Sequence, residues 1–284
     1  VVEYGGDYVA DDANPPRVAC ASAVSQPMVC STMHGSPATA REAVGTSFSA
    51  PKVSHIAARL ADALPDEPCQ LYRALIANSS RWPRWTEDAA DKRAVLRQLG
   101  YGIPDLTRAT TNDDYRVTLI SSGRRPIAAR EAHVYHIPVP AELRSPESDY
   151  TIRIDVTLAY TALPRRTRKH TRNYLAVRLD WDVSKSGESV DSFRNRIFHD
   201  GDHAALDGDA IFNWMLRENV DHGVIEGVSR QKSTLQKDWC YVRSHELPPD
   251  FCIAVVGHPG WDPSPASTAN YALAVSFEAV NQDV

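Results

Sequence analysis

The chain is poor in cysteine and contains no long hydrophobic run. Five cysteines in 284 residues are too few, and odd in number, for a disulfide framework, and none shows the CxxC spacing of a metal site. Cys20 with Cys30, or Cys240 with Cys252, could pair in an exported protein, but we expect a cytoplasmic one with free buried thiols. No stretch of about 18 apolar residues occurs, so we expect no membrane partner.

An excess of charge of one sign is also missing. Lysine and arginine number 31 against 36 aspartates and glutamates, and the net charge of −5 argues against nucleic acid as a main partner. The start, Val1 to Tyr4, lacks the basic residues that open a signal peptide, although a signal further upstream would not be visible. We expect a cytoplasmic protein without metal or cofactor.

Length and apolar content favour two packed units. At about 150 residues per domain, 284 residues suggest two domains, and 43% hydrophobic residues suffice for their cores. The apolar pattern changes from helical to alternating shortly after residue 110. We therefore expect one unit over residues 1–110 and a second over residues 111–284.

A serine stands directly before a stretch with one apolar helical face. Residues 45–51 read Gly-Thr-Ser-Phe-Ser-Ala-Pro, and apolar residues follow at three- and four-residue intervals: Val53, Ile56, Ala57, Leu60, Ala61 and Leu64. This spacing predicts a helix that packs one face inward and holds Ser47 in its first turn. Free N–H groups and the positive end of the helix dipole would stabilise an oxyanion there.

The segment 45–51 resembles the Gly-Thr-Ser-x-Ala/Ser-x-Pro signature of the subtilisin-like serine peptidases, or subtilases, with Ser47 as the nucleophile. Residues 3–9 resemble the strand and glycine-rich turn that precede this loop in the family. Residues 75–80 and 100–104, with Ala109, resemble the helical segments and the Gly-x-Gly turn that close the domain. The resemblance covers about residues 1–110 and implies an α/β fold with a parallel sheet. It also implies that Gly45, Thr46 and Ser47 form the nucleophile and oxyanion loop.

The partners that a subtilase serine needs are not found before it. In this family the order is Asp, His, Ser, with an oxyanion Asn between the last two. The 46 preceding residues contain no Asp-Thr/Ser-Gly or His-Gly-Thr segment, and Asp7, Asp11 and Asp12 fit a solvated turn. His34 would have to bend back from its Gly/Pro-rich loop, and His55 lies about 12 Å further along the helix. We expect the Asp, His and Asn to lie in an upstream part of the same subtilase.

Beyond Tyr115, apolar and polar residues alternate. In residues 150–160 the even positions are apolar, and the odd ones include Arg153 and Asp155, which predicts a half-buried strand. The pattern recurs, or is repeated in shorter form, at 117–120, 134–139, 175–181, 239–243, 251–256 and 271–277. Such strands predict an antiparallel β-sandwich or jelly roll, and the region resembles the jelly-roll domains appended to many subtilases.

Three further features of this region have simpler interpretations. Asp209 is a candidate cap for one helix over residues 211–216. The loop 199–209 is rich in histidine and aspartate but breaks the spacing of a calcium loop, so a solvated loop is favoured over a metal site. The basic run 165–172 is interpreted as a solvated hairpin tip, with docking of an acidic partner surface as the alternative.

The sequence as a whole favours a serine endopeptidase of the subtilisin type. The resemblance implies that Ser47 attacks the peptide carbonyl, that its N–H forms half of the oxyanion hole, and that His, Asp and Asn outside this chain complete the site. The expected partners are a protein or peptide substrate, the upstream part of the subtilase, and a regulatory protein. The alternative is a catalytically silent interaction module whose jelly roll binds a protein. In either case we expect this chain alone to be inactive.

Overall fold

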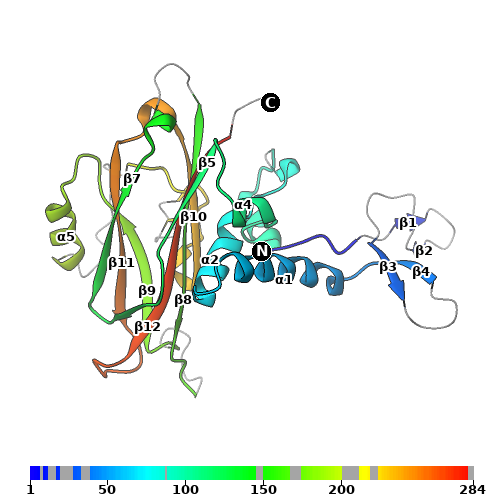
Figure 1. Cartoon of the computed structure of the whole chain (residues 1–284), viewed down its shortest axis with the longest axis horizontal. Coiled ribbons are helices and arrows are strands. Elements are labelled where there is room, and N and C mark those ends of the chain that lie inside the picture. Colours follow the sequence, from blue (N-terminus) through cyan, green and yellow to red (C-terminus); the bar gives the residue numbers. More distant parts are fainter. Residues whose placement is uncertain are drawn as a thin grey trace.

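The computed structural model describes residues 1–6, 9–11, 17–19, 28–32, 39–86, 88–144, 150–166, 174–199, 211–217 and 223–280. For the strands before residue 44 it describes the backbone only. Figure 1 shows a β-rich body, a group of helices beside it, and short strands at the far end of the first helix.

Short strands and helices make up the described part of residues 1–110. The strands β1 (Val9–Asp11) and β2 (Arg17–Ala19) form one antiparallel pair, and β3 (Met28–Thr32) and β4 (Thr39–Ala43) form another. The helices are α1 (Thr46–Ala63), α2 (Cys69–Ser79), α3 (Lys92–Leu99) and α4 (Leu106–Thr110), with a 3-10 turn η1 at Arg84–Thr86. The helix expected after Ser47 is therefore confirmed.

The parallel sheet that the family resemblance implies is not found in the described part of this range. Each described strand pair there is antiparallel. Parallel neighbours need a crossover connection of about a dozen residues or more, and the links between β1 and β2 and between β3 and β4 are far shorter. Residues 3–6, expected as strand and turn, have no regular structure.

Eight strands form two sheets after residue 110. They are β5 (Arg116–Ile120), β6 (Arg125–Ala128), β7 (Ala132–Pro138), β8 (Thr151–Ala162), β9 (Val177–Val183), β10 (Leu235–Arg243), β11 (Asp250–Pro259) and β12 (Thr268–Ala279). One sheet has the order β10-β8-β12-β5, with β6 also on β12, and the other has the order β7-β11-β9. All these pairs are antiparallel. The seven predicted strands are present, whereas β6 was not predicted.

The main core lies between the two sheets. Ile152, Ile154, Val156 and Leu158 of β8 are fully buried in the same cluster as Trp181 of β9, and residues of β11 join them. Aromatic rings meet edge to face within it, with centroids of Phe212 and Phe251 5.0 Å apart. The predicted antiparallel arrangement with apolar even positions is therefore confirmed for β8.

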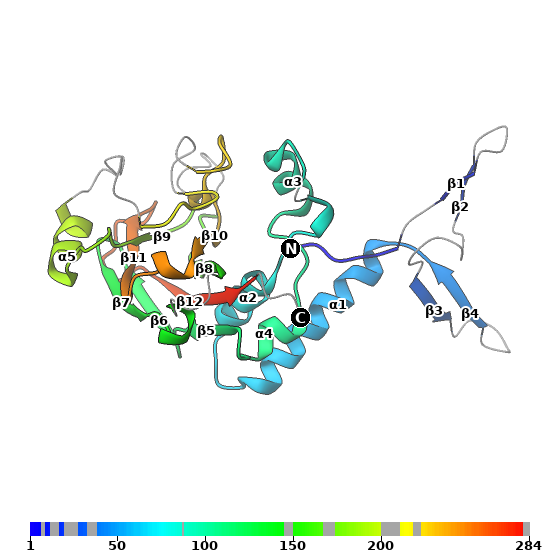
Figure 2. The ribbon, with the colours of Figure 1, turned by 90° about the horizontal axis from the view of Figure 1, so that it is seen from above.

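The prediction that β8 is half-buried is wrong, because its polar face is buried as well. Arg153 is 6% exposed, and Asp155 and Thr157 are 0% exposed. Helix α2 covers this face and lies between the sheet and α1, as Figure 2 shows from above. A second apolar cluster joins Ile56, Leu60, Leu71, Ala74, Leu75 and Ala109 of the helices to Ala159, Ala272 and Ala274 of the sheet. The boundary near residue 110 stays a prediction, but the two ranges pack on each other.

The prediction of a helix at 211–216 is also wrong, because the described residues 211–217 form bends and no helix. Their amides bond across to β10 instead of along a helix. Met215 N–H donates to the Trp239 carbonyl at 2.9 Å, and the N–H groups of Leu216 and Arg217 donate to the Asp238 carboxylate. The candidate cap Asp209 lies outside the described residues. A helix is found earlier, as α5 (Val190–His199), with further 3-10 turns η2 (Ala141–Arg144), η4 (Arg230–Lys232) and η5 (Ser244–Glu246).

Two other expectations concern cysteines and membranes. Cys240 and Cys252 are buried free thiols, as expected, whereas the side chains of Cys20 and Cys30 lie outside the described part. In the described residues, no helix is both long and apolar enough to cross a bilayer.

Candidate nucleophile site

Ser47 lies in the first turn of α1 and its side chain is exposed. Gly45 precedes the helix, and its carbonyl accepts the first turn bond from the Phe48 N–H at 3.0 Å. The helix is anchored by Ile56 and Leu60, which are buried. N–H groups in a first helical turn have no partner one turn earlier, so the amide of Ser47 is placed to donate to a negative oxygen.

The segment 1–6 supports the loop before Ser47 from behind. Gly45 N–H donates to the Gly5 carbonyl at 2.8 Å, and Lys52 Nζ on α1 donates to the Tyr4 carbonyl at 3.0 Å. A Cβ on Gly5 would lie 2.5 Å from the Gly45 oxygen and 2.7 Å from Ser49 Oγ. Gly5 therefore allows the two backbones to approach closely enough to bond.

We expect Gly5→Ala to displace the loop that carries Ser47. The added methyl group cannot occupy its position without moving the Gly45 carbonyl, which is backbone and not the end of a flexible side chain. In an active, complete protein this shift should lower kcat by about 100-fold, because small misplacements of a nucleophile are costly. Gly187→Ala is the control for backbone strain without a clash: a Cβ there meets nothing within 4 Å, so only the cost of alanine at a φ of +69° remains. Equal kcat in both variants would contradict the prediction.

The predicted Gly-x-Gly turn joins the same support. Val2 N–H donates to the Gly102 carbonyl at 3.0 Å, and a Cβ on Gly102 would lie 2.1 Å from the Arg81 carbonyl oxygen. Arg81 lies just after α2, and its N–H donates to the Ile103 carbonyl at 3.0 Å. The Ile103 N–H donates back to the Arg81 carbonyl at 2.8 Å. Segment 1–6 therefore connects the end of α2 to the nucleophile loop.

A cavity of about 510 Å³ lies beside α1. Its lining includes Phe48, Lys52 and His55 from the helix, and Pro104 and Leu106 from the segment after the Gly-x-Gly turn. Ser47 is not part of the lining. His55 is exposed in the cavity wall, two helical turns beyond the serine, which agrees with the expectation that it cannot reach Ser47.

The structure brings no acid or base to the serine in its described part. Among the described residues, no hydrogen bond joins Ser47 to a histidine or to a carboxylate. Asp7, Asp12 and His34 lie outside these residues, as does the Asp11 side chain. The loop 200–209 also lies outside, so the calcium alternative has no described geometry.

A comparison with known families adds a second kind of observation. The model of the subtilase family matches residues 3–102, the range that holds Ser47, α1 and the Gly-x-Gly turn. The match covers about a third of the chain, and residues 3–102, called the subtilase range below, are similar to that family. The chain is also 37% identical over 127 residues to the uncharacterized protein y4bN of Sinorhizobium fredii. That match covers 44% of this chain and 28% of the relative, so the chain spans less than a third of its length.

Where the subtilase range meets the sandwich, a buried charged cluster was missed by sequence reasoning. Asp155 of β8 accepts hydrogen bonds from Arg153 Nε at 2.9 Å and pairs with Arg81 and with Lys237 of β10, both at 3.0 Å. Glu278 of β12 pairs with Arg81, Arg108 and Arg116. The sequence did contain a sign of this cluster, the charged residues Arg153 and Asp155 at odd positions of β8. Alternation alone places such residues on a face exposed to solvent.

Lys237 forms a C-terminal cap for helix α2. Its Nζ donates to the carbonyls of Ala77, Asn78 and Ser80 at 2.9, 3.1 and 2.7 Å. These carbonyls lie in the last turn of the helix and at its C-cap, where a cation also interacts favourably with the helix dipole. The Ala77 carbonyl also accepts the Ser80 N–H, and the carbonyls of Asn78 and Ser80 also accept Arg81 Nη1. A residue of the sandwich therefore completes a helix of the subtilase range.

Burial and charge act in opposite directions on this cluster. Burial alone would raise the pKa of Asp155, but Arg153, Arg81 and Lys237 hold it well below its usual range. Burial would likewise raise the pKa of Glu278, but Arg81 and Arg108 lower it below its usual value. Burial lowers the pKa of Arg81 to about 10. Both carboxylates are thus ionised at neutral pH, where their pairs hold α2 on the sheet.

We expect acid to weaken the fold through these two carboxylates. A carboxylate whose pKa is lowered by folding contributes stability that is fully present above its unfolded pKa of about 4 and is lost as pH falls toward the folded value. The urea midpoint should therefore decrease between pH 5 and about pH 3. Glu278→Gln should make the urea midpoint depend less on pH. An equal slope of the midpoint against pH in the variant and the wild type would contradict this prediction.

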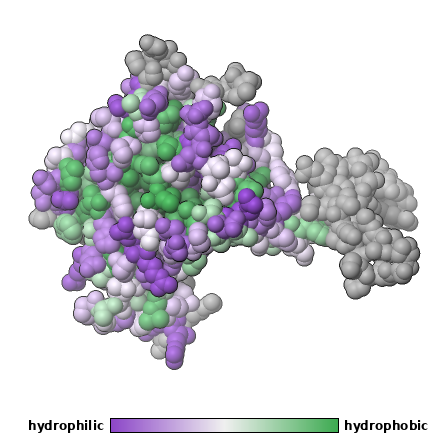
Figure 3. Space-filling view, viewed as in Figure 1, coloured by the Kyte–Doolittle hydropathy of each residue, from purple (hydrophilic) through white to green (hydrophobic). Residues whose placement is uncertain are grey.

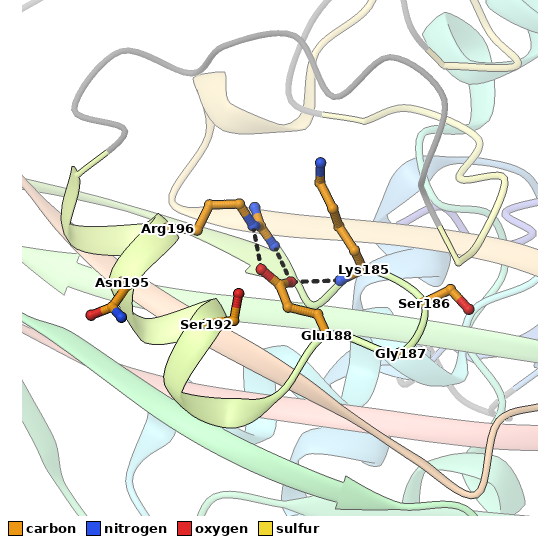
Figure 4. A pocket seen from close by; sticks show the side chains of 7 residues that line it. All are labelled: Lys185, Ser186, Gly187, Glu188, Ser192, Asn195 and Arg196. Carbon is orange, nitrogen blue, oxygen red and sulfur yellow. Dashed lines mark hydrogen bonds and ion pairs between the residues drawn. The ribbon is translucent and has the colours of Figure 1, made fainter.

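A second cavity, of about 680 Å³, lies at the start of α5 and is drawn in Figure 4. Its charged groups bind one another: Arg196 Nε and Nη2 each donate to Glu188 at 3.0 Å, and Arg196 Nη1 donates to Asp182 at 2.8 Å. Glu188 also accepts the Lys185 N–H at 2.8 Å. These bonds fix the turn before α5 and pair the charges of Glu188 and Arg196 with each other.

Proposed function

We propose that this chain is part of a subtilisin-type serine endopeptidase that hydrolyses peptide bonds through an acyl-enzyme on Ser47. The observation that carries the proposal is the exposed Ser47 in the first turn of a helix whose opposite face is anchored, within the range that the subtilase family model matches. A rigid helix start with free N–H groups suits a nucleophile and an oxyanion together.

The proposed roles divide between this chain and an upstream part. Ser47 Oγ attacks the carbonyl carbon, its backbone N–H stabilises the oxyanion, and Gly45 and Thr46 give the substrate room. A histidine outside this chain removes the Ser47 proton and passes it to the leaving amine. An aspartate orients that histidine, and an asparagine completes the oxyanion hole. Water then releases the acyl group, without a cofactor.

We further propose that the sandwich is a jelly roll. In support, successive strands from β7 to β12 alternate between the two sheets, as in folds built from Greek keys. A cytoplasmic location is part of the same proposal and is supported by the free Cys240 and Cys252.

A fluorophosphonate probe tests the function, because it labels a serine only where a base activates it. The 284-residue chain alone should remain unlabelled. Co-expression with the upstream part of the same gene product should produce labelling that Ser47→Ala removes. If that upstream part holds no Asp-Thr/Ser-Gly or His-Gly-Thr segment, or if Ser47 stays unlabelled beside it, the silent interaction module is the better description.

A further inference from the structure

Three segments meet at the end of the sandwich that lies lowest in Figure 1, where β8 and β11 end. Arg165 N–H donates to the Tyr174 carbonyl at 2.8 Å, and Ala176 N–H donates to the Leu163 carbonyl at 2.9 Å. Trp261 N–H donates to the Leu175 carbonyl at 3.2 Å. These bonds hold the three segments together, and the β9–β11 pairing places Arg178 opposite His258, three residues before Trp261. We call the residues Leu163, Arg165, Arg166, Tyr174, Arg178 and Trp261 the arginine surface.

Large apolar side chains are exposed on the arginine surface. Leu163 is 57% exposed and Tyr174 is 42% exposed. The Trp261 ring lies beside them, partly buried, and its Nε1 donates to the Leu163 carbonyl at 3.3 Å. Figure 3 shows hydrophobic and hydrophilic side chains side by side at this end. A fixed, mixed surface of this kind is typical of protein interfaces.

The charge of the surface is positive and opposite to that of the chain. Arg165, Arg166 and Arg178 are exposed, and none has an ion pair among the described residues. Two acids are near these residues in sequence. Asp180 is engaged by His258 at 2.8 Å and by Gln231 at 2.9 Å. Asp262, next to Trp261, accepts from the Ser264 N–H at 3.0 Å and from the Ser267 hydroxyl, so the three arginines still exceed the acids. The whole chain carries a net charge of −5. An anionic partner would therefore be attracted to this end in particular.

We propose that the arginine surface docks an acidic protein segment that carries interleaved apolar residues. The acidic groups pair with the three arginines, and the apolar residues cover Leu163 and Tyr174. A nucleic acid is a poorer fit, because Tyr174 is the one well-exposed ring of the surface, Leu163 offers no stacking face and Trp261 is partly buried. A long polyanion would also meet the rest of an acidic chain. The proposal is independent of Ser47.

Binding of a labelled peptide tests the proposal. The probe is an acidic peptide of about 12 residues in which Glu alternates with Leu and Tyr, titrated with the full 284-residue chain by fluorescence anisotropy. Affinity should fall at least tenfold when Arg165, Arg166 and Arg178 are all changed to Glu, and also as salt is raised to about 0.5 M. Leu163→Ser with Tyr174→Ser should weaken binding severalfold.

A matched variant separates local from overall charge. Arg84→Glu, Arg97→Glu and Arg124→Glu change three other exposed arginines and make the same net change, so they should leave affinity within about twofold. If the reversal variant does not fold by circular dichroism, the three Arg→Gln changes replace it. Equal losses in surface and control variants would overturn the proposal. So would stronger binding of a single-stranded oligonucleotide or an anionic vesicle at the same residues.

Discussion

Replacing Ser47 with alanine in the complete, active protein is expected to abolish peptide hydrolysis and leave the fold intact. Members of a catalytic triad act as a unit, so loss of the nucleophile should lower kcat by a factor on the order of 10⁶. Ser47 is exposed, and its side chain has no packing role in the described structure. The measurements are kcat on a peptide substrate and the thermal midpoint by circular dichroism.

Ser54→Ala provides the control for this experiment. Ser54 is also an exposed serine of α1, two turns further on, so its loss should change neither kcat nor the thermal midpoint. Residual activity of Ser47→Ala within tenfold of wild type would remove Ser47 from the mechanism.

Replacing Lys237 with methionine is expected to destabilise the chain by about 3–5 kcal/mol, the range for breaking a buried ion pair. The methionine keeps the approximate length of the side chain but removes the ammonium donor from the carbonyls of Ala77 and Ser80, which keep only the Ser80 N–H and Arg81 Nη1, respectively. It also removes one of the cations that pair with Asp155. The free energy of unfolding is measured by urea titration at neutral pH.

Hydrogen exchange locates the effect of the same change. Amides in the last turn of α2 should exchange faster in Lys237→Met, because that turn loses its cap. Arg97→Met, which removes an exposed cation from α3, should cost no more than about 0.5 kcal/mol. A loss below about 1 kcal/mol in Lys237→Met, with unchanged exchange in α2, would contradict the role of the ammonium group.

Sequence patterns over neighbouring residues were enough to predict the first helix and most of the strands. The signature and the three-to-four spacing predicted α1 with Ser47 in its first turn, and alternation predicted seven of the strands. The strand β6, of four residues, is too short to show a period. At residues 211–217 the apolar content was identified correctly, since Phe212, Trp214 and Leu216 are buried, but the backbone bonds to β10 and not to itself.

The sequence by itself determined the candidate nucleophile, its helix and the β-rich character of the second range, because each depends on neighbours in the chain. Tertiary structure alone decided what covers the outer face of β8. Alternation reports that Arg153 and Asp155 point away from the sandwich core, but it cannot report that α2 lies on that side. Asp155 is buried as a carboxylate because Arg153 beside it, and Arg81 and Lys237 from distant parts of the sequence, pair with it there.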